Sequence, residues 1–266
     1  MRLLAALLAI AILDAAPAAA ADALAEARRL YNQGQYETAA RYAREAMKMP
    51  ATMESARLVL GRVHLERFRR SADAVDLTQA REALKNINPE SLDARERIEL
   101  LVGMGECAYL EDRFGVAAEI FERALDSSEN LGAGAHERVL DWWATALDRL
   151  ALARPRESRD LLYNRIVGRM EKELALDSSS APAAYWLAAA LRSAGNLERA
   201  WHSATASWIA ATLSRDHGAE LRADLDRLMT QGIIPERAAK LQPRDPKVAT
   251  TSMLAEWESI KAAWVR

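Results

Sequence analysis

The chain has 266 residues, of which 50% are apolar and 28% charged, and its formal net charge is −2. An apolar share of this size excludes wholesale disorder, and the near balance of charge excludes a global field that would attract nucleic acid or an anionic membrane. Much of the apolar share is alanine, the strongest helix former, and no run of alternating or β-branched residues predicts a strand. We therefore expect an all-α protein.

The first residues have the pattern of an export signal. A positive charge at Arg2 precedes the unbroken apolar run 3–13, and Pro17 then ends that run. Small alanines of the kind that a signal peptidase requires follow directly. This order of features predicts cleavage near Ala20 or Ala21.

An uncleaved membrane anchor is the alternative interpretation of residues 1–21. An anchor needs roughly 20 apolar residues, whereas Asp14 and Pro17 interrupt this segment. A central Asp costs about 2.5–3.5 kcal/mol on insertion scales. We therefore expect residues 1–21 to be a cleaved signal peptide, and the mature chain to be periplasmic or secreted without stable membrane insertion.

Three segments further along share one pattern. Each has a turn residue, an apolar residue two positions later, and a small residue after a further three positions. The residues at these places are Gly34, Tyr36 and Ala39, then Asp112, Phe114 and Ala117, and finally Gly195, Leu197 and Ala200. Self-similarity of this kind indicates a repeat architecture in which each unit buries its apolar face against the next.

The pattern resembles the tetratricopeptide repeat, a helix–turn–helix unit of about 34 residues. That family places small residues where the two helices of a unit cross, because helices approach closely only where side chains are small. Gly105 and Ala108 match in the second segment, and Ala188 matches in the third. The resemblance covers about residues 20–208 and implies an α-α superhelical solenoid of about five helix pairs.

Two further units match less closely. They begin near Glu54 and Glu137. In the unit that begins near Glu54, the second helix, around Ala80 and Ala83, starts about three residues later than the family pattern requires. In the unit that begins near Glu137, the second helix, over 157–176, is longer than is usual for a repeat. With these units included, the starts lie near residues 20, 54, 98, 137 and 181. We expect one repeat domain over 22–215.

Residues 216–266 are expected to form a C-terminal helical extension. The pattern predicts a helix over 219–229, which Gly232 and Pro235 interrupt. Pro243 and Pro246 then mark a linker.

A last helix is predicted over 248–265, and its apolar stripe includes Trp257 and Trp264. A solenoid needs an end cap that covers its last apolar face, which this helix could supply. The alternative is that the helix docks on another protein.

No pattern of residues predicts a cofactor or a metal site. The four histidines fall in different units and form no pair with metal-ligand spacing; they are His64, His136, His202 and His217. Gly103, Gly105 and Ala108 match a dinucleotide fingerprint, but they lie inside a predicted helix whose N–H groups are already bonded. No nucleophile elbow or phosphate loop occurs, so we expect no catalytic residues.

The single cysteine is Cys107. Its small and apolar neighbours predict a buried helix position. Pairing with another molecule is the alternative role of an unpaired cysteine in an exported protein.

In proteins of the family that the pattern resembles, the first helix of each repeat lines a binding groove. Carried over position by position, the resemblance assigns partner contacts to Leu24, Arg28, Tyr31, Leu58, Arg62, Leu65, Val102, Glu106, Tyr109, Tyr185 and Arg192. We add Trp257 and Trp264 of the last helix. Tyrosine and arginine are enriched where binding energy concentrates, and this set suits an extended or helical peptide better than a polyanion. The alternative for each residue is packing between repeats.

One subtype of the family clamps a peptide's carboxylate with Lys and Asn side chains. The corresponding positions here hold other residues, namely Leu24, Arg28, Val59, Glu99 and Gly103. That clamp is absent.

The sequence favours a non-enzymatic scaffold that binds a protein or peptide partner. The alternatives are an envelope enzyme or substrate-processing factor with its site after Arg215, and a membrane-anchored regulatory subunit.

Overall fold

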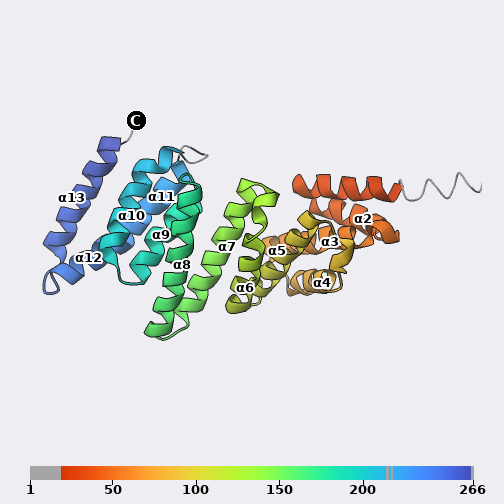
Figure 1. Ribbon diagram of the computed structural model, residues 1–266, viewed down its shortest axis with the longest axis horizontal. Coiled ribbons are helices and arrows are strands. Elements are labelled where there is room, and N and C mark those ends of the chain that lie inside the picture. The colour runs from red at the N-terminus through yellow and green to blue at the C-terminus, as the bar shows by residue number, and fades with distance from the viewer. Residues whose placement is uncertain (1–18, 214–215, 217, 265–266) are drawn as a thin grey trace, which may run out of the picture. The chain divides into compact units, whose positions relative to one another are not determined.

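The computed structural model describes residues 19–213, 216 and 218–264 (Figure 1). Every regular element in these residues is a helix, and none of them forms a strand. The expectation of an all-α protein is confirmed. Most of the predicted signal peptide lies outside the described residues. Among the helices that are described, none is both long and apolar enough to span a membrane.

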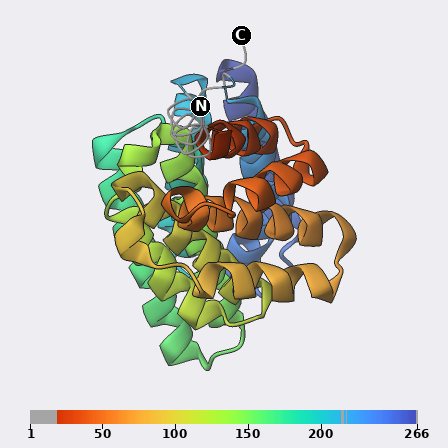
Figure 2. The ribbon, with the colours of Figure 1, turned by 90° about the vertical axis from the view of Figure 1, so that its right-hand side faces the viewer.

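The helices divide into two compact units, one that ends at Leu131 and one that begins at Gly132. In the N-terminal unit, which is coloured from red to yellow-green in Figure 2, residues 19–32 are helical. The helices that follow in this unit are α2 (Tyr36–Ala46), α3 (Pro50–Ser71), α4 (Ala74–Lys85), α5 (Ala94–Leu110) and α6 (Phe114–Leu125). Two short 3₁₀ turns, Pro89–Ser91 and Ser128–Leu131, complete it.

The C-terminal unit contains seven further α-helices among its described residues. They are α7 (Ala133–Leu152), α8 (Arg156–Leu176), α9 (Ala181–Ser193), α10 (Leu197–Ala210), α11 (Ala219–Leu228), α12 (Ile234–Leu241) and α13 (Lys247–Trp264). Consecutive helices pack against each other, as α7 does on α8, α9 on α10, and α12 on α13. A 3₁₀ turn, Ala211–Leu213, follows α10, and a π-helical turn, Met229–Ile233, joins α11 to α12.

The three segments that share a sequence pattern also share one turn geometry. The turn residue has a positive φ in each, namely 72° at Gly34, 58° at Asp112 and 78° at Gly195. Glycine adopts this left-handed conformation at no steric cost, and aspartate tolerates it better than most residues. The turns between the helices are therefore determined by residue type.

The hydrogen bonds of these turns coincide as well. The residue after the turn residue donates its N–H to the carbonyl five positions earlier. These bonds are Gln35 to Leu30 at 2.9 Å, Arg113 to Ala108 at 2.8 Å, and Asn196 to Leu191 at 2.9 Å. This is the pattern of a Schellman helix end. The three segments are thus alike in backbone structure and not only in sequence.

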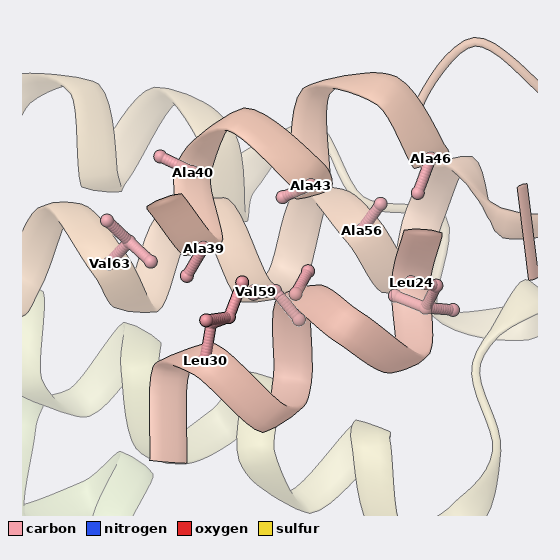
Figure 3. Packing of buried hydrophobic residues seen from close by; sticks show 10 residues of the cluster. Leu24, Leu30, Ala39, Ala40, Ala43, Ala46, Ala56, Val59 and Val63 are labelled. Atoms are coloured by element: carbon pink, nitrogen blue, oxygen red, sulfur yellow. The ribbon is translucent and has the colours of Figure 1, made fainter. Parts of the chain in front are cut away.

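Small residues allow the helices of a pair to approach closely. A Cβ added at Gly105 of α5 would lie 2.6 Å from the ring of Phe121 on α6, and one at Gly61 of α3 would lie 2.7 Å from Leu84 on α4. Alanines play the same part between residues 19–32, α2 and α3, where the buried cluster includes Ala39, Ala43 and Ala56 (Figure 3). The high alanine content therefore serves close packing as well as helix propensity.

The C-terminal helices differ in one respect from the sequence pattern. We predicted that Gly232 and Pro235 would interrupt the helix after residue 229, but the chain stays helical from Ala219 to Leu241. The π-helical turn accommodates Pro235, which lies in the first turn of α12, where a proline is tolerated. Gly232 leaves room for Arg192, whose Cζ atom would be 2.6 Å from an added Cβ. This glycine therefore marks a packing contact rather than a helix end.

Candidate functional site

Ion pairs connect the first helices of the predicted repeats in the N-terminal unit. Arg28 of the first helical segment pairs with Glu96 of α5. The Nη1 atom of Arg62 on α3 lies 2.7 Å from Oε2 of Glu99 on α5, and its guanidinium lies 4.5 Å from the ring centroid of Tyr31. These contacts place side chains of three helices on one common face, which we call the N-terminal face.

The charges on the N-terminal face compensate one another. Arg69 Nη2 lies 2.8 Å from Oε2 of Glu106. Burial raises the pKa of Glu106, and Arg69 and Arg62 oppose that rise. Burial also raises the pKa of Tyr31 to about 12, although the charge of Arg62 acts in the other direction. Arginines therefore balance the carboxylates of this face within the protein.

Three of the residues predicted for this face come together, namely Tyr31, Arg62 and Glu106. Arg28 contributes to the face through its pair with Glu96. Three others are wrong as partner contacts, because Leu24, Leu58 and Leu65 are buried in the core. Val102 and Tyr109 are partly exposed, and the ring of Tyr109 packs edge-on against Phe114 with centroids 5.3 Å apart. Helical spacing alone does not separate a groove position from one that points toward a neighbouring helix, which explains the three errors.

A second face belongs to α7, α9 and α11 of the C-terminal unit, and we call it the C-terminal face. The predicted residue Tyr185 on α9 packs edge-on against Trp186, with centroids 5.6 Å apart. The indole Nε1 of Trp186 donates a hydrogen bond of 2.8 Å to Oδ1 of Asp141 on α7. The predicted Arg192 lies at the other end of α9, and its Nε donates to Glu236 of α12 at 3.0 Å.

Carboxylates surround Tyr185. Its pKa is raised by burial first, and then by the negative charges of Asp224, Asp148 and Asp141, while Arg192 opposes them. Sequence reasoning missed Asp141, Asp148 and Trp186. The available signal was the spacing of the two aspartates, which places them on one face of α7.

The two tryptophans predicted on the last helix have different environments. Trp264 is 52% exposed, whereas Trp257 is fully buried. Trp257 packs against Trp208 of α10, and its Nε1 donates to Oδ1 of Asp226 at 2.8 Å. The prediction that Trp257 contacts a partner is therefore wrong, because α13 uses this side chain to pack on its own unit.

A pocket of about 530 Å³ lies where α2 begins and α3 ends. Its charges are mostly paired, since Arg67 Nε lies 3.2 Å from Asp76 and 3.6 Å from Glu37. Asp76 also contacts the Nδ1 atom of the buried His64 at 2.9 Å. In the described part of the chain, no group of three or more His, Cys, Asp or Glu side chains is placed to hold a metal ion. The charged side chains Arg67, Glu37 and Asp76 of this pocket are therefore engaged with one another.

The single thiol lies in the interior. Cys107 is buried, as its sequence neighbours predicted. Burial and the carboxylates of Glu106 and Glu111 raise the pKa of its thiol to about 12. At neutral pH the group is protonated and unreactive.

The structure thus defines an all-α protein built from helices packed in neighbouring pairs. No protein-family model matches the chain, and no curated protein or solved structure matches it either.

Proposed function

We propose that this chain is a repeat protein of the tetratricopeptide type that acts as a non-enzymatic scaffold and binds a protein partner on the faces of its first helices. The observation that carries the proposal is the C-terminal face. There Tyr185 and Trp186 lie partly exposed beside Asp141 and Asp148, outside the core that holds the helices together. Tyrosine and tryptophan are enriched at protein-binding surfaces.

The repeat class is supported by the local structure. Three helix pairs share one turn conformation and one hydrogen-bond pattern, and glycines or alanines lie at the close approaches between paired helices. Pairs joined by such turns leave their first helices free to form a common binding face. The carboxylates around Tyr185 on the C-terminal face favour a protein or peptide partner over a nucleic acid.

Affinity capture from a cell-envelope extract tests the proposed function. The bait is the full chain, compared with an Arg28→Ala, Tyr185→Ala double variant that truncates one side chain on each face. We expect the wild type to retain a partner that the double variant loses. Leu161→Ala is the matched control, because Leu161 is 72% exposed on α8 and is not one of the residues assigned to either face. Equal capture by all three baits would contradict the proposal, provided that circular dichroism shows equal helix content.

We also propose that the protein acts in the periplasm or cell envelope after export. The support is the charged start, the apolar run 3–13 and the alanines before Asp22. Cleavage near Ala21 leaves Leu24 and Leu30 in the mature chain, so the core of the first helix pair is kept. N-terminal sequencing of protein recovered from the periplasm should give a start near Ala21, whereas a start at Met1 would favour the anchored form.

A further inference from the structure

The carboxylates of the two faces differ in their partners. On the N-terminal face, Glu96, Glu99 and Glu106 each lie against an arginine. On the C-terminal face, Asp224 is paired with Arg227. Asp141, however, accepts a hydrogen bond from the neutral indole of Trp186, and Asp148 accepts one of 3.0 Å from the neutral hydroxyl of Tyr163. Neither aspartate has a cationic partner among the described residues. Their negative charges are therefore not neutralised by a direct ion pair, although the charges of Arg192 and Arg159 oppose them at Tyr185 and Tyr163.

Aromatic rings lie directly beside these charges. Tyr185 and Trp186 present a phenol and an indole ring, both partly exposed, and Asp141 itself is exposed. A cation is attracted both by the face of an aromatic ring and by a carboxylate, and the two attractions add when the groups are adjacent. This combination selects a positively charged side chain. It disfavours a phosphate, an acidic peptide or an anionic lipid surface.

The spacing of the two aspartates limits the shape of the ligand. Asp141 and Asp148 are seven residues apart on α7, which corresponds to about 10.5 Å along the helix axis. A single metal ion does not bridge that distance, because its ligands lie at about 2–2.6 Å. Two cationic side chains seven positions apart on a second helix have the same spacing as the aspartates.

We propose that the C-terminal face binds a basic helical segment of a partner protein, with one Arg or Lys at Asp141 and a second, seven residues along, at Asp148. The inference rests on the proposed function and specifies the chemistry of the partner. Tyr185 and Trp186 then pack against the aliphatic parts and charged heads of the bound side chains. Charge complementarity selects this occupant over a neutral or acidic helix.

Binding of a defined peptide to the full chain tests the proposal. The probe is a fluorescein-labelled, alanine-rich helical peptide with two arginines at positions i and i+7. One control peptide carries glutamates at the same positions, and another carries its two arginines at i and i+5, on different faces of its helix. Fluorescence anisotropy at low and at physiological salt should show binding of the first peptide alone, and weaker binding as salt rises.

The protein variants are Asp141→Asn and Asp148→Asn. The amide oxygen of asparagine still accepts the hydrogen bonds from Trp186 and Tyr163, so only the charge is lost. We expect each substitution to raise the Kd for the i, i+7 peptide roughly three- to tenfold. Glu256→Gln is the matched control, because Glu256 is an exposed carboxylate on α13, and this variant should bind like the wild type.

Two results would overturn the inference: no binding of the i, i+7 peptide at about 1 mM, or equal affinities of the wild type and both asparagine variants. The capture experiment separates this failure from a failure of the proposed function. If Asp141→Asn and Asp148→Asn retain a partner that the Arg28→Ala, Tyr185→Ala variant loses, the scaffold function stands and the basic partner is wrong. If all baits capture equally, both proposals fail.

Discussion

At the scale of single residues, the chain depends on small side chains at a few contacts. Gly105 has no room for a Cβ, because Phe121 of α6 fills the space above it. Gly168 of α8 is also helical, yet nothing lies within 4 Å of an added Cβ there. The two glycines are therefore both helical but differ in their surroundings. Substituting alanine at each of them separates the effect of packing on stability from the effect of helix propensity.

We predict opposite effects for alanine at these two glycines. Gly105→Ala should lower the free energy of unfolding by about 1–3 kcal/mol, because Phe121 must move. Gly168→Ala should raise it by about 0.5–1 kcal/mol, because alanine is the better helix former and space is free. Urea unfolding followed by circular dichroism measures both. Stabilisation by both substitutions would show that α5 and α6 are less tightly packed than the structure has them.

Reactivity of the single thiol is the second prediction at this scale. Cys107 is buried and the pKa of its thiol is raised to about 12, so thiolate is scarce at pH 8. A chromogenic disulfide reagent should label the folded protein only slowly, and label it fully once the protein is unfolded in guanidinium. Fast labelling under native conditions would contradict the buried position and would favour pairing with another molecule.

At the scale of elements, α13 is held to its unit by a small set of contacts. Of the described residues of α13, Met253 and Trp257 are buried. Asp226 of α11 accepts hydrogen bonds of 2.8 Å from both Trp257 Nε1 and Lys261 Nζ. One carboxylate thus joins α11 to two consecutive turns of α13. The strength of the contact between α11 and α13 therefore depends on the charge of Asp226.

Acid should weaken this attachment. Burial raises the pKa of Asp226, but the hydrogen bonds from Lys261 and Trp257 outweigh burial, so the pKa lies below its ordinary value of 3.8. A lowered pKa in the folded protein means that the carboxylate contributes stability above pH 3.8 and loses it as the pH falls through the folded-state pKa. The contribution is small, because the side chain is 37% exposed and solvent screens its charge.

The indole N–H resonance of Trp257 in a nitrogen-15 NMR spectrum reports the protonation of Asp226. We expect its chemical shift to change with a midpoint below pH 3.8 and to lose that dependence in Asp226→Asn. A midpoint at or above the ordinary value would show that the two hydrogen bonds do not stabilise the charged form.

At the scale of the whole molecule, the chain consists of two compact units with their own cores. The C-terminal unit buries large side chains from each of its α-helices, among them Trp143, Ile166, Leu225 and Trp257. The N-terminal unit has separate buried clusters around Val59 and Leu84. Each unit therefore contains the apolar contacts that a folded domain requires.

We predict that residues 132–266 fold without the remainder of the chain. The expected result is a strongly helical circular dichroism spectrum and cooperative unfolding in urea, because the buried side chains of this unit are supplied by its own helices. A gradual, non-cooperative loss of helix would contradict the division into units. The full chain, measured under the same conditions, is the control.

Much of the helical framework was predictable because it is local. Alanine content and turn residues such as Gly34, Asp112 and Gly195 determine where helices run and where they reverse, and the structure has all three turns in the expected places. The length of α8 and the linker before α13 were also predicted. The exception was Gly232, whose role depends on Arg192 from another helix.

The candidate sites were only partly predictable. The repeat resemblance found Tyr31, Arg62 and Tyr185, which lie partly exposed on the two faces, but it also selected Leu58 and Leu65, which are buried. Which positions of a first helix face the groove depends on the rotation of that helix about its own axis, and that rotation depends on how the next pair packs.

The sequence by itself determined the all-helical class and the turns within the helix pairs, because hydrogen bonds and residue preferences within a few positions decide them. Only the tertiary structure decided which carboxylates are neutralised. Arg62 meets Glu99 across 37 positions of the chain, and Asp141 meets Trp186 across 45. A carboxylate pairs with whatever the fold brings within a few ångströms, so the neutral hydrogen-bond partners of Asp141 and Asp148 are a consequence of packing between helices.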